Sequence, residues 1–85
     1  GFTRSLARDA AQHGVLVNAI APGPTATERF LRVPQAKQDA VKAKLFVDRL
    51  GTPEDVAATA LLLAGPGGGF YVGACLSPNG GDVFH

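Results

Sequence analysis

Two short apolar runs, at residues 15–20 and 71–77, constrain the fold of this chain more than any other feature. Neither run alternates between apolar and polar residues, and continuous runs of this length are typical of parallel strands that are buried on both faces. Helical patterns lie between them, and a strand–helix–strand connection joins parallel strands. Two such strands need neighbouring strands and covering helices, which 85 residues cannot both supply. We therefore expect an α/β chain that holds only part of a sheet.

Helical spacing appears in the first half of the chain. Apolar residues recur along 2–12 at intervals that form one stripe, and Gly14 is well placed to end this helix. Residues 27–33 and 35–47 also have helical patterns, with Pro34 interrupting them.

The clearest helix start is Thr52-Pro53-Glu54-Asp55. Thr52 can accept a backbone N–H as the N-cap, Pro53 suits the first helical position, and Asp55 completes a capping box. We expect this helix to end at Gly65 and to face a core through five apolar residues: Val56, Ala57, Ala60, Leu61 and Ala64.

The charge balance excludes several partners. Eight Lys and Arg against seven Asp and Glu leave a net charge of +1, so no basic field is present to hold nucleic acid or a membrane surface. No apolar run approaches the ~18–20 residues that span a bilayer. Charged residues make up 18% of the chain, against about 25% in an average soluble protein, which suggests that much of its surface is covered.

The single cysteine and the two histidines point to no chemistry of their own. Cys75 lies in an apolar stretch, where we expect a small buried side chain rather than a reactive thiol. An unpaired cysteine fits a reducing cytoplasmic compartment. His13 and His85 have no partners at ligand spacing, so the sequence predicts no metal site.

Two glycine-rich loops differ in their position relative to the strands. Residues 21–27 follow the first strand, at the carboxyl edge where open α/β sheets bind ligands. Residues 65–69 lead into a strand instead of a helix, so they lack the helix N–H groups that hold phosphates. In the first loop Gly23 would let a ligand approach the backbone, and Thr25 and Thr27 offer hydroxyls. A turn followed by a threonine N-cap explains the same residues structurally.

Four segments carry a resemblance to a known family. Gly-Val-Leu-Val-Asn-Ala-Ile-Ala-Pro-Gly-Pro-Thr-Ala-Thr (14–27), Arg-Leu-Gly-Thr-Pro-Glu-Asp-Val-Ala (49–57), Leu-Ser-Pro-Asn-Gly-Gly (76–81) and Phe-Thr-Arg-Ser-Leu-Ala (2–7) resemble, in order and spacing, the short-chain dehydrogenases/reductases. The resemblance implies a Rossmann-type parallel sheet with helices on both faces, of which only the last two strands and their helices are present. Residues 1–85 would then be the C-terminal part of one NAD(P)-binding domain.

The resemblance also implies roles for individual residues. Pro22 and Gly23 match the Pro-Gly of the loop that wraps the nicotinamide end of NAD or NADP. The main chain of Thr25 and the hydroxyl of Thr27 match the groups that bind the carboxamide, which orients the ring for stereospecific hydride transfer. Residues 28–47 match the substrate lid. Within it Phe30, Leu31 and Phe46 could line a substrate pocket, and packing of the lid onto its own body explains them equally well.

The resemblance places the catalytic residues outside this chain. The family's Tyr-x-x-x-Lys pair would lie just upstream of Gly1, and Tyr71 lacks the following Lys, so no residue here is assigned to proton transfer. The parent enzyme would transfer hydride between a nicotinamide cofactor and an alcohol or carbonyl, a 3-oxoacyl thioester being one option, and these 85 residues alone would be inactive.

Two questions stay open at this point. The family often forms dimers or tetramers through segments that match Leu61–Leu63 and Val72–Leu76, and a buried face within one domain explains the same residues. The alternative to an enzyme is a non-catalytic truncated homologue or a small interaction module.

Overall fold

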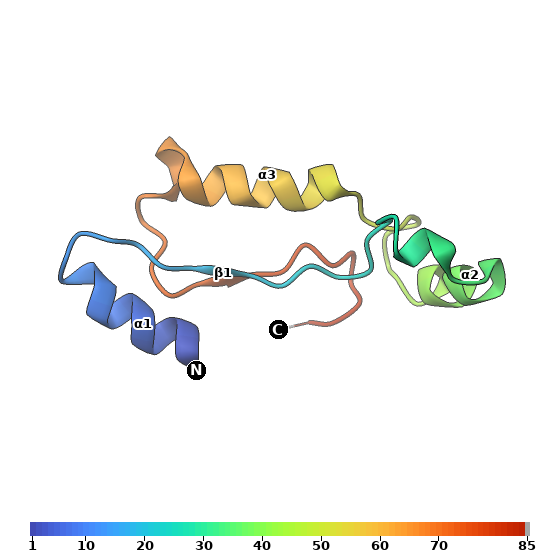
Figure 1. The fold of residues 1–85 in the computed structure, drawn as a ribbon, viewed down its shortest axis with the longest axis horizontal. Coiled ribbons are helices and arrows are strands. Elements are labelled where there is room, and N and C mark those ends of the chain that lie inside the picture. Colours follow the sequence, from blue (N-terminus) through green and yellow to red (C-terminus); the bar gives the residue numbers. More distant parts are fainter. Residues whose placement is uncertain (85) are drawn as a thin grey trace.

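Helices lie on both sides of a pair of parallel strands in the computed structural model, which describes residues 1–84. The elements are α1 (Phe2–Ala11), β1 (Ala19–Ile20), the 3-10 turn η1 (Phe30–Arg32), α2 (Gln35–Ala43), α3 (Pro53–Ala64), the 3-10 turn η2 (Pro66–Gly68) and β2 (Cys75–Leu76). Ala19 lies opposite Cys75, and Ile20 opposite Leu76. α3 runs along one face of the strands, and α1 lies on the other face (Figure 1). The predicted α/β class is confirmed.

The regular strands are shorter than the apolar runs predicted. Only two residues of each run form a ladder, although backbone hydrogen bonds continue from Val17 and Gly73 to Gly23 and Pro78. The interruption has a local cause, since Gly73 has a φ of 66° and leaves the extended conformation. Beside it, the side chain of Asn18 replaces main-chain pairing.

The helix ends follow the sequence closely. Gly14 ends α1 at a φ of 73°, where the N–H of Val15 donates to the carbonyl of Ala10 over 3.1 Å. This geometry is a Schellman motif, and glycine adopts it without steric cost. At α3 the predicted capping box is confirmed: the amide of Asp55 donates to the Thr52 hydroxyl over 3.2 Å, and the amide of Thr52 donates to the Asp55 carboxylate over 2.8 Å.

The face of α3 that packs inward differs from the predicted stripe. Val56, Thr59 and Leu63 are half-buried, whereas Leu61 is 72% exposed. Ala57, Ala60 and Ala64 are exposed too, so most of the predicted stripe is wrong. Residues 56–64 are apolar almost all round the helix, and their spacing therefore could not single out one face.

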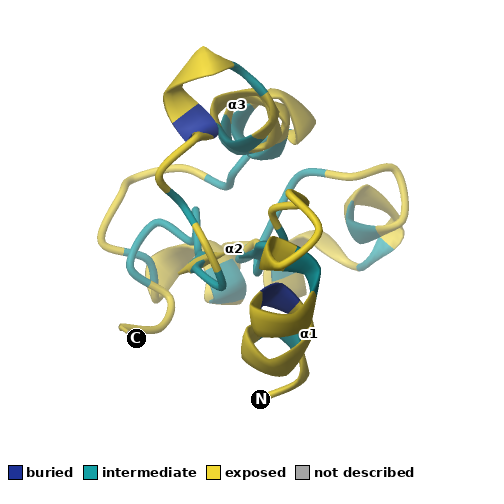
Figure 2. Cartoon of the chain, turned by 90° about the vertical axis from the view of Figure 1, so that its left-hand side faces the viewer, coloured by how far each residue is buried: buried dark blue, intermediate teal, exposed yellow. Residues whose placement is uncertain are grey.

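Little of the described chain is buried. Ala7 is the one buried apolar side chain among residues 1–84, and the helices are exposed over most of their surface (Figure 2). The expectation that Cys75 is buried is wrong, because two partly covered strands leave it open to solvent. The radius of gyration is 15.3 Å, whereas a compact chain of this length has roughly 12 Å.

Candidate functional site

The loop that follows β1 forms a hollow of about 530 Å³ together with the start of α3. It lies beyond the carboxyl end of a parallel strand, the edge at which α/β sheets bind ligands. The two threonines are its polar lining residues, and the others are apolar or glycine. The hollow brings together five of the sequence-predicted residues and two from α3: Pro22, Gly23, Thr25, Thr27, Phe30, Pro53 and Val56.

Gly23 fixes this loop against the turn that follows β2. Its amide donates to the carbonyl of Pro78 over 3.3 Å. A Cβ atom at position 23 would lie only 2.6 Å from the Cα and Cβ atoms of Asn79. The sequence suggested that Gly23 makes room for a ligand, but the structure shows that the close neighbour is Asn79. Glycine is required here by the packing of the chain on itself.

The two threonines make different local hydrogen bonds. The Thr25 hydroxyl donates to the carbonyl of Gly23 over 2.9 Å, within the loop. The Thr27 hydroxyl accepts a hydrogen bond from the amide of Phe30 over 3.2 Å, which fits the interpretation of a threonine N-cap after a turn. A hydroxyl that accepts one bond keeps its own proton to donate. Thr27 is exposed, so that proton can reach a ligand in the hollow.

Residues 27–50 form an excursion whose two ends are joined. The amide of Gly51 donates to the carbonyl of Pro24 over 3.0 Å, and the amide of Ala26 donates to the carbonyl of Gly51 over 2.8 Å. Thr25, between these two partners, forms a parallel bridge with Gly51. The predicted lid 28–47 lies within this excursion.

Residues 28–47 are less helical than the sequence predicted. The pattern at 27–33 gives only η1, and α2 ends at Ala43, four residues before the predicted end at residue 47. The amides of Phe46 and Val47 instead donate to the carbonyl of Gly80, over 2.9 and 3.1 Å, so the helix cannot continue through them.

Of the three pocket residues that the sequence predicted within 28–47, only Phe30 lines the hollow. Leu31 is 54% exposed and contributes nothing to that wall. The ring of Phe46 contacts that of Phe84, with 5.5 Å between their centres. Phe46 therefore packs on the C-terminal segment, away from the threonines.

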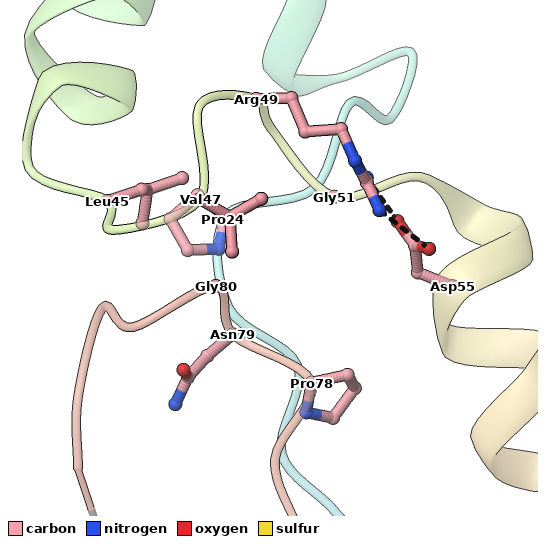
Figure 3. A pocket seen from close by; sticks show the side chains of 9 residues that line it. All are labelled: Pro24, Leu45, Val47, Arg49, Gly51, Asp55, Pro78, Asn79 and Gly80. Carbon is pink, nitrogen blue, oxygen red and sulfur yellow. Dashed lines mark hydrogen bonds and ion pairs between the residues drawn. The ribbon is translucent and has the colours of Figure 1, made fainter.

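An ion pair that was not predicted from the sequence lies next to the loop that follows β1 (Figure 3). Arg49 contacts Asp55 through two bonds, Nη1 to Oδ2 over 2.6 Å and Nη2 to Oδ1 over 3.2 Å. The Arg49 guanidinium and the amide of Thr52 hold the pKa of the Asp55 carboxyl well below its ordinary value, and the same contact raises the pKa of Arg49. The sequence signal was an arginine six residues before the capping-box aspartate.

The ion pair lines a smaller cavity of about 210 Å³ at the back of the loop. Figure 3 shows its walls, which come from the loop after β1, the end of the excursion 27–50, the start of α3 and the turn after β2. Its lining residues are Pro24, Leu45, Val47, Arg49, Gly51, Asp55, Pro78, Asn79 and Gly80.

Residues 1–84 contain no group of three side chains that could hold a metal ion, and His85 lies outside the described residues. None of the helices described is long and apolar enough to cross a membrane.

Comparison with known proteins places this chain in a family. Residues 1–82 match the family model described as enoyl-(acyl carrier protein) reductase. The acetoacetyl-CoA reductases of Shinella zoogloeoides and Rhizobium meliloti are 38% and 40% identical to the chain, each over 99% of its length. The chain belongs to the short-chain dehydrogenase/reductase family. The 3-oxoacyl-[acyl-carrier-protein] reductase of Pseudomonas aeruginosa, 37% identical over 95% of the chain, is a further similar protein.

As a member of the short-chain dehydrogenase/reductase family, the chain is short. It spans 35% of each acetoacetyl-CoA reductase and 33% of the Pseudomonas protein, about a third of the length of the curated relatives it matches.

Proposed function

We propose that this chain is the C-terminal part of an NAD(P)(H)-dependent oxidoreductase. The complete enzyme, meaning the protein that joins these residues to the remaining two-thirds of its domain, transfers hydride between the nicotinamide cofactor and an alcohol or carbonyl. The observation that carries this proposal is the hollow beyond β1, where Pro22, Gly23, Thr25 and Thr27 lie together. The names of the reductase relatives support a 3-oxoacyl thioester as substrate.

In this proposal the chain's own residues bind and orient the cofactor. The exposed Thr27 hydroxyl donates its proton to the nicotinamide carboxamide, and the main chain of Thr25 provides the second contact. Two directed contacts on one amide fix the orientation of the ring, whose chemistry is hydride transfer when the cofactor is bound. Phe30 and Val56 add apolar walls that exclude water. Residues 28–47 act as the lid, and the catalytic Tyr and Lys belong to the rest of the enzyme.

The test begins with the gene upstream of Gly1. We expect a reading frame with a Gly-rich loop and a Tyr-x-x-x-Lys pair, and a complete protein that oxidises NADH or NADPH in the presence of acetoacetyl-CoA. A start codon next to Gly1, or a complete protein that binds neither cofactor, would overturn the proposal. Either result would favour the alternative, a non-catalytic interaction module.

A further inference from the structure

The carboxylate of Asp55 joins three pieces of chain at one point. It receives both bonds from Arg49 and the bond from the amide of Thr52, while its own amide completes the cap of α3. Arg49 and Asp55 form the one ion pair found within residues 1–84. The end of the excursion 27–50 is thereby attached to a rigid helix start.

Gly51 connects the ion pair to the loop that follows β1. It lies between Arg49 and Thr52, and its two main-chain bonds hold Pro24 and Ala26 on either side of Thr25. The fit is close, since a Cβ atom at Gly51 would lie 3.3 Å from the Pro24 carbonyl oxygen and 3.8 Å from the Asp55 carboxylate. A movement of residues 49–52 therefore displaces the loop that carries Thr25 and Thr27.

We propose that Arg49 and Asp55 are a positioning pair for the nicotinamide loop. The pair holds the base of the lid against α3, so that Gly51 keeps Thr25 and Thr27 in the geometry that binds the carboxamide. Neither side chain lines the hollow beyond β1, so neither touches the cofactor there. This inference rests on the proposed function and adds to it two residues that act through others.

The exposure of the ion pair allows its positioning role to be tested separately from the global stability of the fold. The side chains of Arg49 and Asp55 are 56% and 35% exposed. Ion pairs this open to solvent contribute little to global unfolding, because water and salt screen them. The Thr52 cap, by contrast, is a stability feature of α3 itself. Removing the ion pair and removing the cap should therefore have different consequences.

The experiment compares Arg49→Gln with Thr52→Ala in the complete enzyme. We expect Arg49→Gln to raise the Kd of NADPH or NADH, measured by cofactor fluorescence without substrate, by roughly two- to tenfold, with little change in Tm. Thr52→Ala should lower Tm and leave that Kd within about twofold of wild type, because the Arg49–Asp55 bonds remain. Amide exchange at Gly51 and Ala26 should speed up only in Arg49→Gln.

Two further variants complete the set. Arg49→Lys should restore part of the cofactor affinity, since an ammonium group can still bond one carboxylate oxygen. Arg8→Gln, in α1, should leave the Kd and the exchange rates unchanged. If Arg49→Gln binds cofactor as wild type does, or no more weakly than Thr52→Ala, the positioning role is overturned while the proposed function stands. A wild-type enzyme that binds neither cofactor overturns both.

Discussion

At the scale of single residues, Gly23 marks where the loop after β1 meets the turn after β2. Replacing it with alanine would bring Cβ to 2.6 Å from Asn79, so the two segments would have to separate. We expect Gly23→Ala to destabilise the complete enzyme by roughly 1–3 kcal/mol in urea unfolding, as overpacking does. Gly69→Ala is the matched control, since Gly69 has a φ of −66° and no atom within 4 Å of an added Cβ. Equal stabilities for the two variants would contradict the packing argument.

Thr27 tests the proposed binding of the carboxamide. In the complete enzyme, Thr27→Ala should weaken cofactor binding by roughly 1–3 kcal/mol, because the carboxamide would be left with an unpaired polar group. Thr27→Ser keeps the hydroxyl, so it retains both that contact and the cap on Phe30. Titration of the variants with NADH and NADPH checks this. Wild-type affinity in Thr27→Ala would remove Thr27 from the site.

Part of this site could be predicted from the sequence because its residues lie close together along the chain. The residues from Pro22 to Thr27 share one loop, so their proximity follows from the sequence alone. The neighbour of Gly23 could not be foreseen in the same way, because Asn79 lies 56 residues later and meets it only in the fold. Whether Phe46 turns toward the threonines or toward Phe84 also depended on the fold.

At the scale of elements, Asn18 connects the two extended segments where their ladder is interrupted. Its amide nitrogen donates to the carbonyl of Tyr71 over 3.0 Å, and its carbonyl oxygen accepts from the amide of Ala74 over 2.9 Å. We expect Asn18→Ala to cost the complete enzyme roughly 1–3 kcal/mol, because two half-buried backbone groups lose their partner. Asn18→Asp should also destabilise, since its carboxylate cannot donate to Tyr71. Amide exchange at Ala74 should rise in Asn18→Ala, and an unchanged rate would contradict the role.

The contacts of the Asp55 carboxylate with Arg49 and with the amide of Thr52 predict a dependence of stability on pH. The pKa of Asp55 in the folded chain lies below its ordinary value of 3.8, so the ionised carboxylate favours folding. That contribution is present above about pH 4 and is lost as the pH falls through the folded pKa. The Tm difference between wild type and Asp55→Asn should therefore be largest near neutral pH and should narrow in acid. A constant Asp55→Asn difference across this pH range would contradict the prediction.

Helix ends were more predictable than strands because their signals are local. The Thr52–Asp55 box and the stop at Gly14 depend on residues a few positions apart, and both formed as predicted. A strand needs a partner from elsewhere in the chain. The apolar runs 15–20 and 71–77 therefore predicted longer strands than those that form. The ladder stops where Gly73 leaves the extended conformation.

At the scale of the whole molecule, the chain exposes surface that globular proteins cover. It measures 49 × 24 × 22 Å, and large apolar side chains are open on α1, on α3 and in the loops. Leu61 and Phe70 are 72% and 100% exposed, and Phe2 at the start of α1 is 81% exposed. The low content of charged residues predicted that much of this surface is covered. The proposal that this chain completes a larger domain accounts for these uncovered faces.

The isolated 85-residue chain provides the test at this scale. Exposed apolar surface and an unpaired strand edge favour association, so we expect the chain alone to self-associate, to bind the dye ANS and to melt without a cooperative transition. It should show no dehydrogenase activity. Leu61→Lys should improve its solubility because this side chain is open to solvent, whereas Leu63→Lys should not, because Leu63 is half-buried. A monodisperse 85-residue chain that unfolds in one sharp transition would show that these faces need no cover, and the chain would then be a domain in its own right.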